Sequence, residues 1–280
     1  MKIGIQGEKG AYSEAAAQAL YGKSSQIVFY EYFEDVFKAV KSNKVQKGVI
    51  PIENSLAGCI HQNYDLLQKY KLNIVGEIKL RVEHVLMCHP STKLDVIREV
   101  RSHPQALSQC SQLFREHKKL KPIPFYDTAG AAKSVAENPE PKVAAIASRL
   151  AASEYGLKIL KKNVENQSNN YTRFLGISKS TVKAPLGKNM KCSLSVVAAR
   201  EESGVLFKML GVFALRDINL VKIESRPLPS KTFEYIFYLD FMGNPKDAKI
   251  KRALEHLQEL STDYHFYGAY PEGKFTKISG

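Results

Sequence analysis

The sequence predicts an α/β protein with a large N-terminal part of two lobes and a small C-terminal part of βαββαβ order. Three observations support this fold class. Segments with strand and helix periodicity alternate through residues 1–178. The apolar runs at 49–52 and 143–147 are short and uninterrupted, which is typical of strands buried on both faces of a parallel sheet. After residue 190 the order of the elements changes.

The N-terminal part is expected to contain βαβ units in a mostly parallel sheet. Strands are expected at 2–7, 26–31, 47–53, 98–103, 121–126, 142–148 and 171–178, and helices at 13–21, 33–43, 61–71, 104–117, 127–137 and 148–156. Two long extended segments, 72–89 and 157–178, are typical of crossings between two lobes.

The expected boundaries follow from these elements. The large domain spans 1–180, with one lobe formed by 1–76 together with 156–180 and the other by 77–155. Residues 179–190 combine Lys, Pro, Gly and Asn without periodicity, which is typical of a linker.

The C-terminal part is expected at 189–272. Its elements in order are a strand at 191–200, a helix at 204–217, strands at 219–227 and 233–243, a helix at 247–261 and a strand at 263–271. This βαββαβ order is the ferredoxin-like arrangement. Because many functions use that arrangement, topology alone does not assign one.

The net charge does not indicate a nucleic-acid partner. The 280 residues include 41 Lys and Arg against 28 Asp and Glu, a formal net charge of +13. Nucleic-acid binders usually concentrate such an excess on one face or in one run. Here it is spread along the chain, and the densest cluster, 115–121, has no interleaved aromatic residues. We expect a solvated surface whose field helps to attract an anionic substrate.

We expect a cytoplasmic protein without a membrane partner. No apolar stretch approaches the ~20 residues of a membrane span, and no secretory leader opens the chain. The four cysteines have neither metal-ligand spacing nor a disulfide pattern. The seven histidines also lack ligand spacing, so no metal is expected.

The glycines after the first strand do not match a dinucleotide site. Gly4, Gly7 and Gly10 are spaced G-x-x-G-x-x-G rather than G-x-G-x-x-G. They lead into a helix that starts near Ser13, whose free N–H groups can hold a carboxylate. By this argument an anion site and a plain turn stay equally open.

Other polar residues stand where strands lead into helices. Asn54 and Ser55 follow a buried strand, as ligand-binding residues or as helix caps. His103 and Thr128 begin two further helices, and Gln109 lies within the first of these. Several helix N-termini at one cleft make a site for a small dianion without a metal. Thr172 and Arg173 add a hydroxyl and a cation at the start of a strand.

Four motifs together resemble the prephenate dehydratase family and the closely similar arogenate dehydratases. They are Pro51-Ile52-Glu53-Asn54-Ser55, Ser102-His103-Pro104-Gln105, Asn170-x-Thr172-Arg173-Phe174 and Glu224-Ser225-Arg226-Pro227. The Gly7-x-x-Gly10-x-Tyr12-Ser13 start agrees with this resemblance, which spans nearly the whole chain. It implies a bilobed, periplasmic-binding-protein-like catalytic domain followed by an ACT regulatory domain, and we expect no fused chorismate mutase.

The resemblance implies a carbon–oxygen lyase that needs no cofactor. Prephenate would lose carbon dioxide and its ring hydroxyl to give phenylpyruvate, on the way to L-phenylalanine; the alternative substrate is arogenate. The resemblance assigns catalytic roles to Thr172, Asn54 and Gln109. The expected substrate-binding residues are Ser55, Ser102, His103, Thr128, Arg173 and Phe174. Thr172 is expected to donate a hydrogen bond to the leaving oxygen, while Glu53 or His103 supplies the proton.

The ACT resemblance implies feedback by L-phenylalanine in a homodimer or homotetramer, with the effector at a subunit seam. The expected effector-binding residues are Gly204, Val205, Leu206, Phe207, Asn219, Leu220, Glu224 and Ser225. One departure stands out: the family's Gly-Ala-Leu-Ala element has bulkier residues here, at Val205 and Phe207. A non-catalytic binding protein and an amino-acid-responsive regulator are the other classes considered; the lack of a leader and of a DNA-reading helix argues against them.

Overall fold

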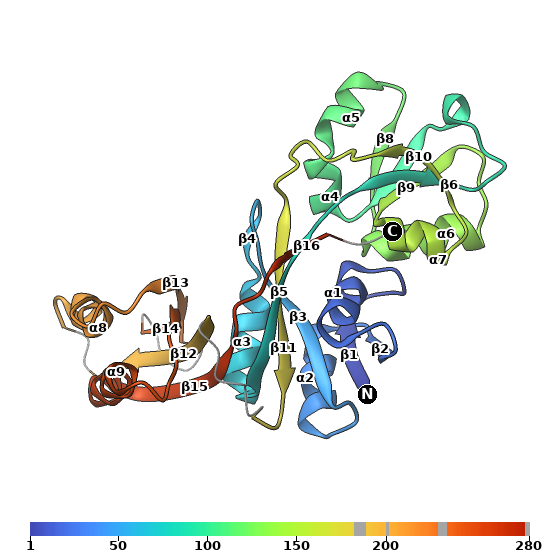
Figure 1. Cartoon of the computed structure of the whole chain (residues 1–280). Coiled ribbons are helices and arrows are strands. Elements are labelled where there is room, and N and C mark those ends of the chain that lie inside the picture. Colours follow the sequence, from blue (N-terminus) through green and yellow to red (C-terminus); the bar gives the residue numbers. More distant parts are fainter. Residues whose placement is uncertain (182–188, 200–201, 229–233, 278–280) are drawn as a thin grey trace. The chain divides into compact units, whose positions relative to one another are not determined.

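The computed structural model describes residues 1–181, 189–199, 202–228 and 234–277 (Figure 1). Most of the segment expected to be a linker therefore lies outside the described residues. The chain forms two compact units. The N-terminal unit comprises Met1–Ile60, Ile78–Phe174 and the chain end from Lys274, and the C-terminal unit comprises His61–Glu77 and Leu175–Gly273.

The first sheet contains three parallel strands and lies mostly in the N-terminal unit, while its residues 73–77 and 175–178 fall in the C-terminal unit. Its strands are β1 (Lys2–Gln6), β2 (Gln26–Tyr30), β3 (Lys47–Asn54), β4 (Gly58–Cys59), β5 (Asn73–Arg81), β11 (Tyr171–Ser178) and β16 (Phe275–Thr276). The order is β16-β5-β11-β3-β1-β2, with β4 paired to β3. β1 runs parallel to β2 and β3.

Two helices accompany this sheet, α1 (Tyr12–Tyr21) and α2 (Phe33–Lys41). The buried alanines 15–17 of α1 pack with Ile3, Ile5 and Val49 of the sheet. Small side chains on the buried helix face allow a close approach of helix and sheet.

The second sheet forms the other lobe of the same unit (Figure 1). Its strands are β6 (Val85–Cys88), β7 (Glu99–Ser102), β8 (Lys121–Pro124), β9 (Val143–Ala147) and β10 (Lys158–Lys162), in the order β10-β6-β9-β7-β8. The helices of this lobe are α4 (Pro104–Gln109), α5 (Ser111–Glu116), α6 (Thr128–Glu137) and α7 (Arg149–Glu154).

Strand β9 is buried on both faces, as its apolar run predicts. Ala144 and Ile146 belong to one hydrophobic cluster, and Val143, Ala145 and Ala147 belong to another. Alternate residues of a strand point to opposite faces, so the two clusters cover the two faces of the sheet. The predicted α/β class is confirmed.

Three details differ from the expectation. The second sheet is mixed, because β6 runs antiparallel to both β9 and β10. β6 enters directly from an extended crossing segment, so no crossover helix sets it parallel to its neighbours. β10 lies in a segment expected in the first lobe, but it pairs with β6 of the second sheet. The helix expected at 104–117 is divided into α4 and α5 at Cys110, whose backbone leaves the helical region (φ −109°, ψ 21°).

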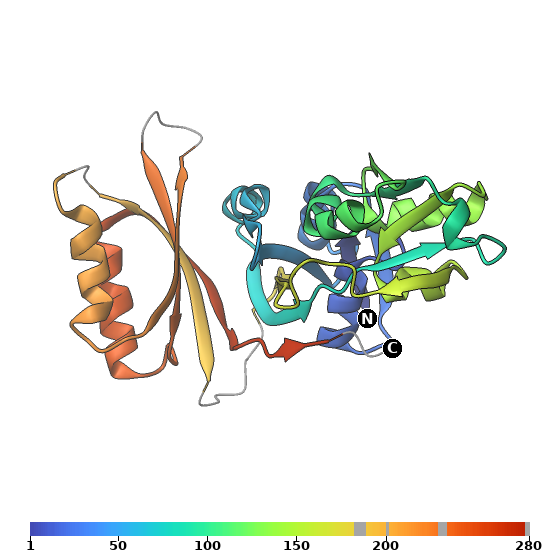
Figure 2. The ribbon, with the colours of Figure 1, turned by 90° about the horizontal axis from the view of Figure 1, so that it is seen from above.

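The C-terminal unit contains an antiparallel sheet with two helices on one face (Figure 2). Its elements are β12 (Met190–Ala198), α8 (Val205–Ala214), β13 (Leu220–Pro227), β14 (Tyr235–Met242), α9 (Ala248–Glu259) and β15 (Ser261–Pro271). The strand order is β13-β14-β12-β15, and every pair is antiparallel. Met209 and Phe213 of α8 pack with Ile250 and Leu257 of α9 over the sheet. The predicted ferredoxin-like order is confirmed.

The helix α3 (His61–Tyr70) belongs to this C-terminal unit, although it precedes the sheet by more than a hundred residues. The Tyr238 hydroxyl donates to the Tyr64 carbonyl at 2.9 Å, and Arg226 binds both carboxylate oxygens of Asp65 at 3.3 and 2.9 Å. Chain order had suggested that this helix belongs to the first lobe.

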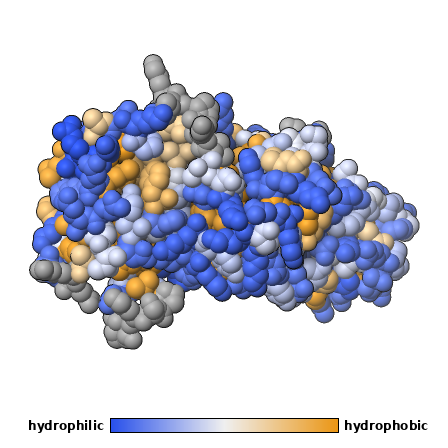
Figure 3. Space-filling model, turned by 90° about the horizontal axis from the view of Figure 1, so that it is seen from below, coloured by the Kyte–Doolittle hydropathy of each residue, from blue (hydrophilic) through white to orange (hydrophobic). Residues whose placement is uncertain are grey.

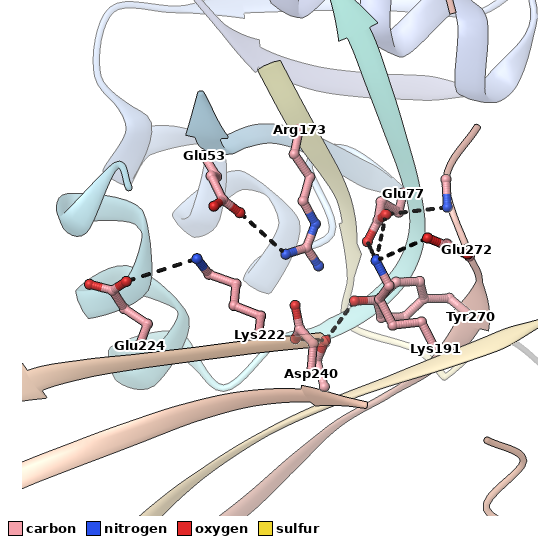
Figure 4. Close-up of polar contacts among 11 residues, drawn as sticks. Glu53, Glu77, Arg173, Lys191, Lys222, Glu224, Asp240, Tyr270 and Glu272 are labelled. Carbon is pink, nitrogen blue, oxygen red and sulfur yellow. Dashed lines mark hydrogen bonds and ion pairs between the residues drawn. The ribbon is translucent and has the colours of Figure 1, made fainter. Parts of the chain in front are cut away.

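A buried ion pair joins β5 to β12 within the same unit. Lys191 Nζ lies 2.9 and 3.0 Å from the two carboxylate oxygens of Glu77, and 3.9 Å from Glu272 (Figure 4). The Gly273 N–H also donates to Glu77, at 3.3 Å. None of the described helices has the length and apolar composition that crossing a membrane requires.

Candidate functional site

A pocket of about 260 Å³ lies in the N-terminal unit, lined by residues of both lobes. Six of the residues expected to be catalytic or to bind substrate line it: Asn54, His103, Gln109, Thr128, Thr172 and Phe174. They come from β3, from α4 and the residue before it, from α6 and from β11, and the folded chain brings together positions that lie up to 120 residues apart.

Asn54 stands at the carboxyl end of β3 in a fixed orientation. Its Oδ1 accepts the backbone N–H groups of Leu56 and Ala57, both at 3.0 Å. Because the oxygen is engaged there, Nδ2 must face the other way. It donates to Thr172 Oγ1 at 3.0 Å and to Asn170 Oδ1 at 2.8 Å.

This contact determines how the Thr172 hydroxyl can act. Oγ1 accepts a hydrogen bond from an amide that has no acceptor to offer in return. The hydroxyl proton is therefore directed away from Asn54. Thr172 is largely buried but lines the pocket, so its proton is available to an oxygen atom bound there.

The same reasoning orients Gln109. Asn170 uses its oxygen to accept from Asn54, so its Nδ2 donates to Gln109 Oε1 at 3.0 Å. With Oε1 accepting, the Gln109 amide nitrogen remains available as a donor. A chain of three side-chain amides thus leaves two donors, those of Gln109 and Thr172, on residues that line the same pocket.

His84 closes this network and is neutral. Its Nε2 lies 3.3 Å from Gln109 Oε1, which is already an acceptor, so Nε2 must carry the hydrogen. Burial lowers the pKa of His84 to about 4. In this tautomer Nδ1 carries no hydrogen and lies 3.0 Å from the Tyr12 hydroxyl, whose single proton is shared between Nδ1 and the Glu83 carbonyl at 2.6 Å. Both rings line the pocket.

Asp127 caps helix α6 at the pocket wall. Its Oδ1 accepts from the N–H groups of Ala129 and Gly130 at 2.6 and 3.0 Å. We expect the start of α6 to hold a substrate anion, but two of its N–H groups already donate to the capping Asp127. Burial raises the pKa of Asp127.

Three residues expected to bind substrate, Ser102, Ser55 and Arg173, lie outside this pocket. Ser102 is fully buried and its hydroxyl donates to the Ile146 carbonyl at 2.6 Å. Ser55 is exposed and ties its loop to β11 through the backbone of Tyr171, at 2.8 and 2.9 Å. Both hydroxyls are thus used to hold the polypeptide.

Arg173 also points away from the pocket. It follows Thr172 on β11, and successive residues of a strand face opposite sides. Its guanidinium lies 3.8 Å from Glu53, and Figure 4 shows the two side chains directed toward each other. Of the two expected proton sources, Glu53 is therefore engaged elsewhere, while His103 lines the pocket.

The expected effector residues form two groups in the C-terminal unit. Gly204, in the left-handed region at φ 80°, begins α8 without a side-chain cap, and Phe207 is 80% exposed one turn later. Asn219 and Leu220 lie beyond the other end of α8. The ten residues of α8 span about 15 Å, so this helix separates the two groups within a single chain.

The second group continues along β13, which begins at Leu220 and also carries the candidates Glu224 and Ser225. Ser225 is exposed, while Glu224 faces α3 and lies 3.1 Å from His61 Nε2. In the described part of the chain no group of three His, Cys, Asp or Glu side chains is arranged to hold a metal ion.

Sequence reasoning missed His84, Tyr12 and Asp127 as pocket residues, and Asn170 as the link between two amides. His84 carries no motif, and only its burial beside Gln109 reveals its role. Tyr12 and Asn170 belonged to motifs quoted for the resemblance but were given no function. Asp127 precedes a helix in the pattern of an N-cap, which predicts its hydrogen bonds but not its place in a pocket.

Comparison with known proteins gives consistent results. The family model described as prephenate dehydratase matches residues 3–182. Arogenate dehydratase/prephenate dehydratase 2, chloroplastic, of Arabidopsis thaliana is 42% identical over 97% of this chain and 73% of its own length. Arogenate dehydratase 2 of Petunia hybrida is 41% identical, over 97% and 72%.

Two solved structures are similar over almost the whole chain. The prephenate dehydratase of Arthrobacter aurescens in complex with L-Phe has a TM-score of 0.91 at 26% identity, covering 100% of this chain and 93% of that one. A protein described as GqqA, a novel type of quorum quenching acylase, has a TM-score of 0.89 at 33% identity, covering 98% of both chains.

Proposed function

The chain belongs to the prephenate dehydratase family, and from that premise we propose that the pocket of its N-terminal unit is the catalytic site, with Thr172 as the donor to the leaving group. The enzyme is a dehydratase of the prephenate and arogenate type. Prephenate is the substrate expected from the sequence, and arogenate is the alternative. One gives phenylpyruvate and the other L-phenylalanine.

Both reactions need the same events. The bond between the ring and its carboxylate breaks, the electron pair enters the ring, and the carbon–oxygen bond at the opposite ring carbon breaks. Carbon dioxide and, after protonation, water leave. Formation of the aromatic ring drives the reaction, so the protein has to bind, orient and stabilise the departing oxygen.

The observation that carries the proposal is the contact between Asn54 and Thr172. It directs the threonine proton away from Asn54, so that this proton can stabilise the negative charge that develops on an oxygen leaving in the pocket. The Gln109 amide, which also lines the pocket, offers a second donor. A threonine hydroxyl is too weak an acid to supply the proton by itself. His103, on the pocket wall, is our candidate for that step.

Acyl hydrolysis, the activity for which one solved relative is described, needs a nucleophile activated by a base. In the described residues Thr172 Oγ1 accepts from an amide, and no hydrogen bond joins it to an imidazole or a carboxylate. The pocket therefore supports dehydration better than acyl transfer.

The test is turnover of the purified enzyme. Incubation with prephenate should produce phenylpyruvate, whose enol is measured by its absorbance in alkali, and incubation with arogenate should produce phenylalanine. A folded enzyme that converts neither compound would overturn the proposal.

For the C-terminal unit we propose an ACT-type regulatory function with L-phenylalanine as the effector. The solved relative in complex with L-Phe and the ferredoxin-like topology support this. The start of α8 has free N–H groups for a carboxylate. The separation of the candidate residues into two groups favours a site completed by a second copy of the chain, hence a homodimer or homotetramer.

This regulation is tested on the full-length enzyme. L-Phenylalanine should release or absorb heat in calorimetry and should lower the turnover rate. Ser225→Leu, at an exposed position of β13, should abolish the inhibition without changing uninhibited kcat/KM. Inhibition unchanged in this variant would contradict the assignment of β13.

We also propose a cytoplasmic location. All four cysteines are free thiols, which fits a reducing compartment. The plant relatives named above include one described as chloroplastic. Fractionation of the native source would decide between these locations.

A further inference from the structure

The pocket has an unusual charge for a site that binds a dianion. Of the described residues that line it, Asp127 is the one carboxylate, and there is no lysine or arginine among them. Prephenate carries two carboxylates. Arogenate carries the same two carboxylates and an ammonium group, so its net charge is smaller by one.

One oxygen of Asp127 accepts no hydrogen bond from the described residues. Oδ1 is engaged by the N–H groups of Ala129 and Gly130, whereas Oδ2 faces Gly7. A Cβ atom at Gly7 would come within 3.1 Å of Oδ2, and the backbone there has a φ of +109°, which side chains rarely adopt. The glycine therefore leaves space beside Oδ2, and Asp127 is one of the residues that line the pocket.

The charged groups around Asp127 do not neutralise it. Glu8 adds negative charge nearby, and its own partner is Lys133, at 3.1 Å. His103, which also lines the pocket, is the group whose charge favours the ionised form of Asp127. Burial raises the pKa of Asp127, so the carboxylate gains stability from any cation that a ligand brings.

The two substrates differ at one carbon of the side chain, which bears a carbonyl in prephenate and an ammonium group in arogenate. We propose that Asp127 binds the ammonium group of arogenate and makes this enzyme selective for the amino form over the keto form. The proposal rests on the proposed function of the pocket. A carbonyl offers Oδ2 only another acceptor, and the extra negative charge of prephenate is repelled.

A charge-assisted hydrogen bond in a partly dry site is expected to give about 10- to 100-fold discrimination. We therefore expect the wild-type kcat/KM for arogenate to exceed that for prephenate by about 10-fold or more. Initial rates are required, because phenylalanine is both the product from arogenate and the proposed effector.

The variant Asp127→Asn tests the negative charge of Asp127 apart from its role as the cap of α6. Asparagine caps a helix about as well as aspartate, so α6 keeps its cap while the negative charge is lost. The expected result is a fall of about 10- to 100-fold in kcat/KM for arogenate, with an unchanged or higher value for prephenate. Asp127→Ser, which also preserves a cap, should behave in the same way.

Asp247→Asn is the control for the loss of one negative charge at the start of a helix, because Asp247 precedes α9 in the C-terminal unit and lies outside the pocket. It should change neither value. A ratio of the two kcat/KM values that is the same in Asp127→Asn and in the wild type would overturn the inference, as would a wild-type preference for prephenate. That second result needs no variant. A folded wild-type enzyme that converts neither compound would instead refute the proposed function.

Discussion

The side-chain nitrogen of Asn54 lies 3.0 Å from the hydroxyl oxygen of Thr172, and the oxygen of the same amide is held by two backbone N–H groups. The amide cannot rotate without losing both of those bonds. The Thr172 proton therefore points away from Asn54, and Thr172 lines the pocket. In the proposed site this contact between two neutral side chains orients the donor before substrate arrives.

Thr172→Val tests this donor directly. Valine has nearly the same shape but no hydroxyl, so kcat should fall by about 100-fold or more, while KM changes little. Thr172→Ser keeps the hydroxyl and should retain most of the activity. Steady-state kinetics of the three enzymes, with circular dichroism to verify folding, would show this. Near-normal turnover by the valine variant would remove Thr172 from the catalytic role.

Asn54→Asp tests the orientation of the donor. A carboxylate still accepts the two loop N–H groups, but it cannot donate to Thr172 and instead attracts the threonine proton. We expect kcat to fall to about the level of the Thr172→Val variant, roughly 100-fold. The double variant Asn54→Asp/Thr172→Val should fall no further, because the two residues act as a unit. Additive losses would mean that Asn54 acts independently of Thr172.

The buried His84 should make stability depend on pH. Its pKa in the folded protein is about 4, below the ordinary 6.5, so the unfolded chain binds the proton first as pH falls. Stability should therefore fall as pH decreases from about 6.5 toward 4, by roughly 3 kcal/mol at most.

Urea unfolding between about pH 7.5 and 4.5 measures this loss. In His84→Gln the decline in this window should be smaller by a corresponding amount. The exposed His256 provides the control, since His256→Gln should keep the wild-type decline. Identical pH dependence in the wild type and in His84→Gln would show that His84 takes up its proton normally in the folded enzyme.

The sequence allowed much of this fold to be predicted. The apolar run at Val143–Ala147 predicts a strand buried on both faces, and it is one. The βαββαβ order from Met190 onward needed only local periodicity. Local patterns do not reveal which distant elements pack together. The sequence of α3 does not indicate that this helix contacts Tyr238 or Arg226, so its place in the C-terminal unit follows only from the folded structure.

The candidate site was predictable in its motifs but not in its geometry. Thr172 and Arg173 are adjacent, and strand alternation alone requires that only one of them faces a given side. The hydroxyl of Ser102 donates to the carbonyl of Ile146, 44 residues away, and no sequence pattern predicts this contact. His84 likewise stands in an extended segment with no motif, and its neutrality results from burial.

The buried pair of Lys191 and Glu77 should be important for stability. Their side chains are 5% and 0% exposed, so Lys191→Met leaves a carboxylate without its counter-charge in the interior. We expect a loss of about 3–5 kcal/mol in the free energy of unfolding. Adding Glu77→Gln should restore part of it, because the amide is neutral and still accepts from Gly273.

Urea titrations of these variants provide the measurement, and an exposed pair provides the control. Lys208 and Glu202 lie 2.6 Å apart but are 51% and 47% exposed, so Lys208→Met should cost less than about 1 kcal/mol. A cost of Lys191→Met no larger than that of Lys208→Met would mean that the buried pair is not essential to the fold.

The last prediction concerns the exposed apolar face of α8 and β13. Phe207 on α8 and Leu215 just after it are 80% and 87% exposed, and Val221 and Ile223 on β13 are 43% and 42% exposed. β13 is an edge strand, and alternate residues on it, such as Glu224, face α3 instead. Figure 3 shows hydrophobic residues at the surface between hydrophilic ones on the face that it draws.

An unpaired strand edge beside apolar side chains is a surface that proteins normally cover. In the proposed homodimer a second copy of the chain covers it. Phe207→Glu places a charge at the most exposed aromatic of this face and should weaken self-association by about 10-fold or more. Sedimentation equilibrium of the full-length enzyme gives the dissociation constant. Tyr32→Glu is the matched control, since Tyr32 is 60% exposed in the N-terminal unit and should leave the constant unchanged. A monomeric wild type, or equal association by the wild type and Phe207→Glu, would show that this face does not join two subunits.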